Sequence, residues 1–279
     1  MRPDVLAAVA DWPAPTAAAA VVGPSGVLAA TGPTDHLFPL ASVTKPLAVL
    51  AMLVAVEEGA VELTDAADEV LLPGATMGHL LAHASGLAPE RALRSFPPAT
   101  RRVYSNVGVE LAAARVAAAT GLQFASYFDE ALVRPLALGA TSLPGSPARD
   151  GISTVDDLVR VMQEILTPQG FLHSSTLQDA TTVQYPGLRG VLPGYGGQDP
   201  NDWGLGFEIR AHKHPHWTGG TNSPATFGHF GQSGTMFWID PVARVGLVAL
   251  SDRAFGPWAA AAWPALSDAV LRSATTAAG

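Results

Sequence analysis

Ser42 and Lys45 stand three residues apart at the start of the apolar segment S-V-T-K-P-L-A-V-L-A-M-L-V-A-V. Residues at this spacing are neighbours on a helix surface, so the Lys45 amine can reach the Ser42 hydroxyl and either take its proton or stabilise its alkoxide. Pro46 is tolerated only in the first turn of a helix, which predicts a helix that begins close to Ser42. The spacing indicates a serine nucleophile, although an isolated serine at a helix start also serves as a cap.

A second segment, R-R-V-Y-S-N-V-G, supplies Tyr104 and Asn106 directly before an amphipathic helical pattern. A phenol with a pKa near 10 becomes a useful base only where nearby positive charge lowers that pKa, and Lys45 is the expected source of the charge. The amide of Asn106 can both donate and accept, which suits it to orient Lys45 and an amide of the substrate. It can equally cap the helix that follows.

A third segment, F-G-H-F-G-Q-S-G, supplies His229 and Gly231 on an expected strand, followed by Gln232. Glycine in an exposed strand lets a substrate lie close to the backbone. A histidine with a pKa near 6.5 is mostly neutral at pH 7. His229 therefore lacks the permanent positive charge that would hold a substrate carboxylate.

Together these segments resemble the signature set of the serine β-lactamase and penicillin-binding-protein superfamily. The second motif has the form Y-x-N, with tyrosine in first place, which is similar to the class C β-lactamase branch. Further matching segments are H-L-L-A-H-A-S-G-L (79–87), V-R-P-L-A-L-G-A-T-S (133–142), I-S-T-V-D-D-L-V-R-V-M (152–162) and W-G-L-G-F-E-I (203–209). The resemblance implies an acyl-enzyme on Ser42, with Tyr104 as the base and Lys45 supplying the field. It also implies an oxyanion hole from the backbone N–H groups of Ser42 and Gln232. Which of Tyr104 and Lys45 moves the proton stays open.

Histidine stands where β-lactamases and DD-peptidases usually carry the lysine of K-T-G, and the resemblance associates this form with esterases and aminopeptidases. We therefore expect a carboxylesterase that acts on small acyl esters or amides. The enzymatic alternatives are a β-lactamase, a D-Ala-D-Ala or D-amino peptidase, and an acyltransferase that passes the acyl group to an alcohol or amine. The non-enzymatic alternative is a catalytically weak penicillin-binding sensor or scaffold, against which the three intact motifs count.

The pattern of elements predicts an α+β fold, an α/β sandwich in which an antiparallel sheet is flanked by N- and C-terminal helices and carries an inserted all-helical lobe. Residues 1–60 and 196–279 are expected to form the α/β lobe and residues 61–195 the helical lobe, with the active site in the cleft between them. The expected strands are 17–22, 27–31, 203–210, 234–239 and 245–251, and the expected helices are 76–83, 107–120, 124–132, 154–166 and 256–272.

The composition argues against two classes of partner, and the resemblance implies a small-molecule acyl substrate. A formal charge of −8 over 279 residues argues against nucleic acid and against an anionic membrane surface. The apolar run Leu47–Val56 is far shorter than the roughly eighteen residues of a membrane-spanning helix. The chain has no cysteine, and its start offers only a short apolar run before Asp11, a poor secretory signal. We expect a cytoplasmic enzyme without a cofactor; the oligomeric state is left open.

Histidine spacing gives no convincing metal site. His79 and His83 have the i, i+4 spacing of zinc ligands, but Leu80 stands where H-E-x-x-H has glutamate. The histidines of A-H-K-H-P-H-W are expected to lie in a solvated loop, at positions 212, 214 and 216. Aromatic residues that can wall an apolar acyl pocket are Trp203, Phe207, Trp217, Phe227 and Phe230.

Overall fold

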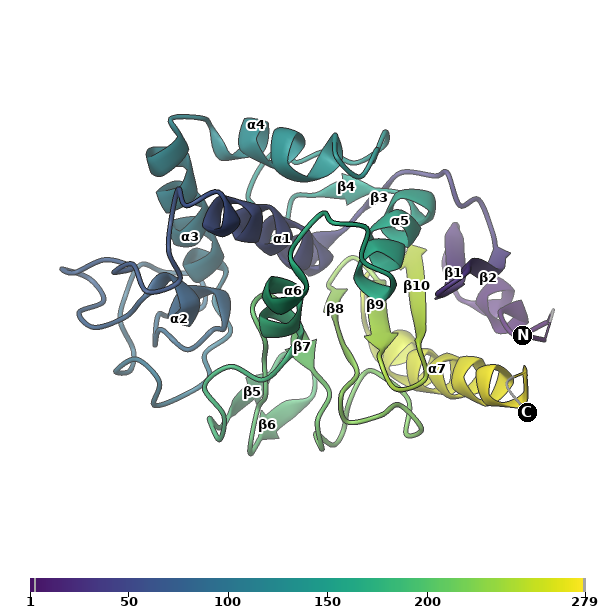
Figure 1. Ribbon diagram of the computed structural model, residues 1–279. Coiled ribbons are helices and arrows are strands. Elements are labelled where there is room, and N and C mark those ends of the chain that lie inside the picture. The colour runs from purple at the N-terminus through teal and green to yellow at the C-terminus, as the bar shows by residue number, and fades with distance from the viewer. Residues whose placement is uncertain (3, 278–279) are drawn as a thin grey trace.

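A six-stranded antiparallel sheet forms the centre of the molecule, in a computed structural model that describes residues 1–2 and 4–277. Its strands are β1 (Ala17–Gly23), β2 (Gly26–Thr31), β7 (Glu208–Ile209), β8 (Phe227–Gly231), β9 (Thr235–Asp240) and β10 (Val245–Ser251). Their order is β2-β1-β10-β9-β8-β7, so the two ends of the chain meet where β1 pairs with β10 (Figure 1).

Most of the helices lie between β2 and β7 in the chain. They are η2 (Ala41–Val43), α1 (Thr44–Glu57), α2 (Met77–Leu81), α3 (Asn106–Thr120), α4 (Phe124–Phe128), η3 (Asp129–Val133), α5 (Val155–Leu166) and α6 (Ser174–Thr181), with η1 (Ala7–Asp11) and α7 (Pro257–Ala277) near the chain ends. The short strands β3 (Phe38–Pro39) and β4 (Ile152–Ser153) pair with each other, as do β5 (Gly190–Leu192) and β6 (Gly196–Gln198).

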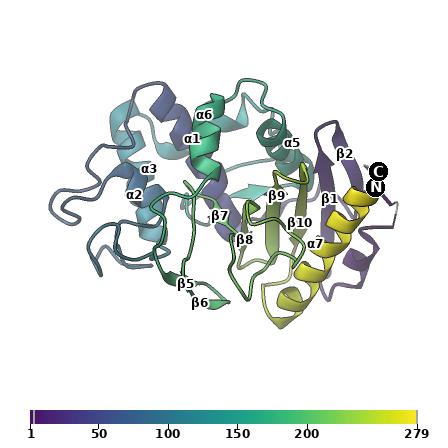
Figure 2. The ribbon, with the colours of Figure 1, turned by 60° about the horizontal axis from the view of Figure 1, so that its bottom comes forward.

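The sheet is covered on both faces, which explains why every residue of β8, β9 and β10 is buried. Successive residues of a strand point to opposite faces. Accordingly, Ala18 and Ala20 of β1 belong to the core cluster that contains α1 and α5, whereas Ala19 and Val21 belong to the cluster formed by η1 and α7. Figure 2 shows α1, α2 and α3 beside the β7 and β8 end of the sheet, while α7 and both termini lie toward β1 and β2.

The predicted α+β fold is confirmed, including the terminal strands and the helices after Asn106 and Thr154. The expected strand 203–210 is wrong, because only Glu208 and Ile209 pair with β8. Gly206 has a φ of 75° and bonds through its N–H to the carbonyl of Leu81, which fixes the preceding residues as a turn packed on the helices. The apolar pattern of that segment reflects burial of its side chains and not pairing with a neighbouring strand.

Part of the helical middle of the chain packs directly on the sheet and does not stand apart from it as a separate lobe. Helix α5 packs against β1 and β10, and α1 packs against α3, α4 and η3. The division at residues 61 and 195 stays a prediction. In the part of the chain that the structure describes, no helix has both the length and the apolar character needed to cross a membrane.

Candidate active site

Ser42 lies in the single turn η2, directly before α1, so the prediction of a helix that begins close to Ser42 is confirmed. The turn is held from two sides. Leu40 donates through its N–H to the Gly151 carbonyl at 2.8 Å, and its own carbonyl accepts from Thr235 Oγ1 at 2.8 Å. Ala41 adopts a φ of 46°, a region that costs free energy for a residue with a side chain, and these hydrogen bonds hold it there.

Gly231 supports this turn from β8. A Cβ at this position would overlap the Leu40 carbonyl oxygen and Thr235 Oγ1. Its glycine is therefore required for packing of the strand against the nucleophile turn. This corrects the sequence interpretation, in which the missing side chain made room for the substrate.

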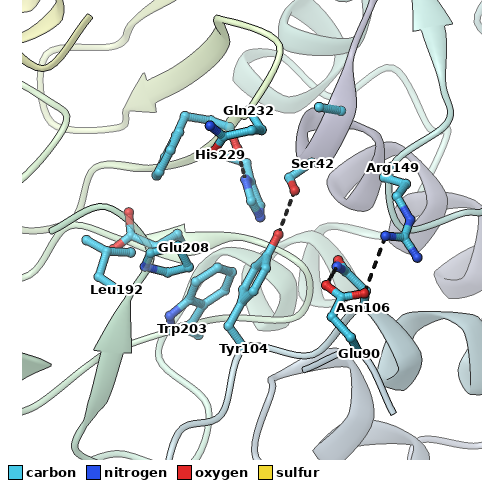
Figure 3. A pocket seen from close by; sticks show the side chains of 13 residues that line it. Ser42, Glu90, Tyr104, Asn106, Arg149, Leu192, Trp203, Glu208, His229 and Gln232 are labelled. Atoms are coloured by element: carbon cyan, nitrogen blue, oxygen red, sulfur yellow. Dashed lines mark hydrogen bonds and ion pairs between the residues drawn. The ribbon is translucent and has the colours of Figure 1, made fainter. Parts of the chain in front are cut away.

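Two polar groups converge on the Ser42 hydroxyl, and Figure 3 shows one of them, the hydroxyl of Tyr104. Lys45 Nζ lies 3.2 Å from Ser42 Oγ, and the Tyr104 hydroxyl lies 2.8 Å from the same oxygen. Lys45 is fully buried and also donates to the Ala148 carbonyl at 2.7 Å, while its Nζ sits 4.6 Å from the centre of the Tyr104 ring. The sequence motifs thus meet at one oxygen atom.

The segment before α3 places Tyr104 through its neighbours. Val103 donates through its N–H to the His83 carbonyl at 2.9 Å, and the Ser105 N–H donates to His83 Nδ1 at 3.2 Å. Ser105, and not Asn106, caps α3 by accepting from the Gly108 N–H at 3.0 Å. His83 therefore positions the backbone on both sides of the tyrosine.

Burial shifts the two proton-handling groups in opposite directions. It lowers the pKa of Lys45 to about 7, with a smaller contribution in the same direction from the Arg149 charge. Burial raises the pKa of Tyr104, and this outweighs the hydrogen bond with Ser42 that lowers it. The expected lowering of the Tyr104 pKa by nearby ammonium charge is therefore not seen in the free protein. Lys45 is the group that can be neutral near pH 7.

Asn106 does not contact Lys45 in this structure. Its Nδ2 donates to the Glu90 carboxylate, and its buried Oδ1 has no hydrogen-bond partner. Arg149 lies 3.3 Å from the other Glu90 oxygen and 3.5 Å from Glu110 Oε1. The expected orientation of Lys45 by Asn106 is thus wrong for this state, and the Ala148 carbonyl takes that place.

His229 is neutral and presents a nitrogen lone pair. Its Nδ1 donates to the carbonyl of Phe230 at 2.7 Å, which leaves Nε2 as an unprotonated acceptor. This Nε2 is buried without a partner. Burial and the nearby Lys45 charge lower the pKa of His229 to about 3, so it carries no charge at pH 7. Figure 3 shows its ring beside the Ser42 and Tyr104 hydroxyls.

The site opens into a cavity of about 350 Å³ that Ser42, Tyr104, Asn106, His229 and Gln232 all line. Its remaining lining residues are Ala41, Glu90, Arg149, Leu192, Pro193, Trp203, Glu208 and Phe230. Among the five aromatic residues considered from the sequence, Trp203 and Phe230 are in this lining, while Phe207, Trp217 and Phe227 are buried elsewhere. The cavity combines apolar walls with a few polar groups near the nucleophile, as small-molecule sites do.

A buried ionic cluster lies behind the pocket and corrects the expectation of a solvated loop at 212–216. Lys213 and His216 are buried and both bond to the Glu208 carboxylate, as does Trp217 Nε1 at 2.9 Å. Burial alone would raise the pKa of Glu208, but His216 and Lys213 outweigh it and lower that pKa to about 2. His212 and His214 are exposed as expected.

No group of three or more potential metal-ligating side chains occurs among residues 1–2 and 4–277. His79 is used locally, since its Nδ1 bonds to the N–H and hydroxyl of Thr76 and its ring stacks on Tyr185 at 4.2 Å. The i, i+4 pair of histidines therefore serves packing.

Glu90, Arg149 and Glu208 are pocket residues that the sequence motifs did not identify. Glu90 follows the H-A-S-G-L segment by three residues, which is the one available signal. Arg149 lies in a connection without periodicity, and only the fold brings it to Glu90. The sequence pattern places Glu208 in a strand and gives no sign that it lines the site.

Comparison with known proteins gives a consistent result. The sequence profile of the family described as Beta-lactamase matches residues 7–271. A crystal structure of a β-lactamase from Mycobacterium bovis is 52% identical, with a TM-score of 0.94, and the match covers 97% of this chain and 99% of that one. No curated protein sequence matches the chain.

More distant structures share the fold alone. A mutant simvastatin synthase from Aspergillus terreus is 17% identical with a TM-score of 0.80, covering 97% of this chain and 93% of that one. A hydrolase described as having promiscuous acyltransferase activity is 17% identical with a TM-score of 0.76, covering 96% of each chain. The family profile spans nearly the whole sequence, the S-x-x-K and Y-x-N segments meet at Ser42, and His229 of the H-x-G segment lines the same pocket, so the chain belongs to the Beta-lactamase family of serine hydrolases.

Proposed function

We propose that this protein is a carboxylesterase that hydrolyses small acyl esters through a covalent acyl-enzyme on Ser42. The observation that carries the proposal is the position of Ser42 Oγ, 3.2 Å from Lys45 Nζ and 2.8 Å from the Tyr104 hydroxyl, at the edge of a largely apolar cavity. A serine hydroxyl is a weak nucleophile until a neighbouring group takes its proton. Here a buried amine with a pKa near 7 is within reach of that proton.

In the proposed first step, Ser42 Oγ forms a bond to the ester carbonyl carbon while its proton passes to neutral Lys45. The bond from that carbon to the alcohol oxygen then breaks. The leaving oxygen takes a proton from the Tyr104 hydroxyl, which is replenished from the Lys45 ammonium, so both side chains end neutral. Water reverses these transfers in the second step and releases the acid. Backbone N–H groups of Ser42 and Gln232, both at the cavity, are proposed to stabilise the oxyanion.

The charges around the pocket support a neutral substrate over one that bears a carboxylate. His229 is uncharged, and its Nε2 offers a lone pair that would repel a carboxylate oxygen. Arg149 is the cation in the cavity lining, and it lies between the carboxylates of Glu90 and Glu110. An anionic substrate would therefore have to compete with two carboxylates for one guanidinium.

A substrate panel tests this proposal. p-Nitrophenyl esters, a chromogenic cephalosporin and D-amino-acid p-nitroanilides should be compared at the same enzyme concentration, with Ser42→Ala as the control. We expect the wild type to hydrolyse the esters with a higher kcat/KM than the other two substrate classes. Ser42→Ala should hydrolyse none of them. Cephalosporin cleavage above about 10⁴ M⁻¹s⁻¹, the lower end of ordinary enzyme efficiency, would contradict an esterase.

β-Lactam hydrolysis is the second candidate, because the Mycobacterium bovis protein at 52% identity is described as a β-lactamase. His229→Lys separates the two activities, since it restores a cation where the wild type has a neutral ring. We expect this variant to shift the ratio of cephalosporin to ester turnover upward. An unchanged ratio would mean that His229 does not decide the choice of substrate.

A further inference from the structure

A second apolar cavity lies against the outside of the Ser42 pocket. It has a volume of about 400 Å³, and its lining includes Phe96, Val103, Val191, Tyr104 and Pro193. Tyr104 and Pro193 also line the Ser42 pocket, so the two cavities are adjacent. Tyr104 reaches from this outer cavity to the nucleophile, where its hydroxyl bonds to Ser42 Oγ.

Strand β5 forms the partition between the cavities. Leu192 is buried and lines the Ser42 pocket, whereas its neighbour Val191 is 56% exposed and lines the outer cavity. This follows from the alternation of side chains along a strand. Pro193, the next residue, lines both cavities, so the two cavities border each other at this residue.

The lining of the outer cavity is mostly apolar, and the Arg101 guanidinium is the cation that lies against it. Phe96, Val103, Val191 and Pro193 are all accessible to some degree. The Arg101 guanidinium lies 5.2 Å from the centre of the Phe96 ring and so covers part of it. Arg102, also in the lining, is buried and donates to four backbone carbonyls, so it is engaged in holding the fold.

We infer that the outer cavity binds an aliphatic chain of the ester whose carbonyl sits at Ser42. This inference rests on the proposed function and names its substrate class: esters whose apolar chain extends past Pro193, in preference to acetates. The chain belongs either to the acyl half or to the alcohol half of the ester. Each methylene transferred from water to such a surface can improve kcat/KM by up to about fourfold.

The test compares chain lengths in the wild type and in variants of Val191. Val191→Asp places a carboxylate in the outer cavity, and Val191→Trp fills it. Both changes are at an exposed strand position, so they should leave folding intact. Val27→Asp is the matched control. Val27 is 52% exposed on β2, at the edge of the six-stranded sheet that lies opposite β7.

For the wild type we expect kcat/KM for p-nitrophenyl octanoate to exceed that for the acetate by at least tenfold. Both Val191 variants should lose most of this ratio while acetate turnover stays within about twofold, and Val27→Asp should keep it. A parallel series of alkyl acetates, assayed by acetate release, carries the chain in the alcohol half of the ester. If the Val191 variants change the chain-length dependence of this series, the alcohol chain enters the cavity; if they change that of the p-nitrophenyl series, the acyl chain does. If Val191→Asp and Val191→Trp leave both series unchanged, the inference is wrong.

Binding to Ser42→Ala separates failure of this inference from failure of the proposed function. p-Nitrophenyl octanoate, kept below its aggregation limit, should bind Ser42→Ala at least tenfold more tightly than it binds Ser42→Ala/Val191→Asp. If the wild type turns over no ester but this difference is present, the esterase proposal fails and the chain site stands. If acetate is hydrolysed but neither p-nitrophenyl octanoate nor octyl acetate distinguishes the two variants in binding, the chain site fails and the esterase proposal stands.

Discussion

Ser42 and the two groups around its Oγ have types and spacings that the sequence predicts, but the protonation of those two groups depends on burial. Ser42, Lys45 and Tyr104 were identified from the sequence, and the structure brings them within 3.2 Å of one oxygen. The family resemblance implies Tyr104 as the base, and the residues alone leave open whether Tyr104 or Lys45 moves the proton. In the folded chain, burial of both groups makes Lys45 easier to deprotonate and Tyr104 harder. Desolvation arises from the whole packing environment, which no local motif encodes.

The pH dependence of acylation follows from Lys45. Below pH 7 the amine is protonated and cannot accept the Ser42 proton, and above pH 7 it is neutral and can. We expect kcat/KM for a p-nitrophenyl ester to rise with pH through an apparent pKa of about 7 and then level off. His229, with a pKa of about 3, adds no step between pH 5 and 9. Stopped-flow or steady-state rates corrected for spontaneous hydrolysis measure this profile.

Lys45→Met is the matching variant. It should lower kcat by about 10²–10⁴-fold, the range of a positioned acid or base, and remove the step near pH 7. A wild-type profile that falls above pH 7 would show that the ammonium is the active form, and Lys45 would then act through its charge alone.

Tyr104→Phe removes the hydroxyl that lies 2.8 Å from Ser42 Oγ and keeps the ring that packs near His83 and Trp203. We expect the folded variant to lose about 10²–10⁴-fold in kcat, because the leaving alcohol loses its proton donor. Circular dichroism checks the fold, and alcohol release from an alkyl ester, whose alkoxide needs a proton to leave, measures acylation. Retention of more than about a tenth of wild-type kcat would exclude Tyr104 from proton transfer.

At the scale of elements, the turn η2 depends on the strand that packs behind it. The H-x-G motif was predicted to lie on a strand, and β8 confirms this. The reason for its glycine was not predictable, because it depends on the Leu40 carbonyl, almost two hundred residues earlier in the chain. The mistaken strand at 203–207 has the same origin. Gly206 packs against Val49 of α1 and bonds to Leu81, and Gly204 lies against the Ala180 carbonyl, contacts that only the tertiary fold supplies.

Gly231→Ala tests this support. The added methyl would force apart β8 and the Leu40–Ser42 segment, so we expect kcat to fall by more than tenfold and the free energy of unfolding to fall by about 1–3 kcal/mol. Gly197→Ala in β6 is the control, since a Cβ there meets no atom within 4 Å. Chemical denaturation and ester turnover measure both effects. Equal behaviour of the two variants would contradict the packing role of Gly231.

At the scale of the whole molecule, a single buried arginine joins segments that the sequence separates. Arg102 donates to the carbonyls of Ala82, Gln184, Tyr185 and Asn201 at 2.6–3.0 Å. Burial lowers its pKa to about 10, so it stays charged at neutral pH. The general fold was predictable from alternating strand patterns near both chain ends and helical periodicity between them. This cross-link was not, because an arginine in a connection gives no periodic signal.

Arg102→Met should leave these buried carbonyls without their donors. Each hydrogen bond to a charged group contributes about 1.5–3 kcal/mol, so we expect the free energy of unfolding to fall by about 3 kcal/mol or more. Urea denaturation measures the loss, with the exposed Arg115→Met as the control. A loss below about 1 kcal/mol would show that solvent replaces Arg102 at little cost.

The central claim is that Ser42 carries the acyl group, and intact-protein mass spectrometry after reaction with a fluorophosphonate or an activated ester tests it most directly. We predict the addition of one phosphonyl or acyl mass, located by peptide mapping at Ser42, and no addition in Ser42→Ala. A label on a different serine, or full ester turnover by Ser42→Ala, would contradict the account.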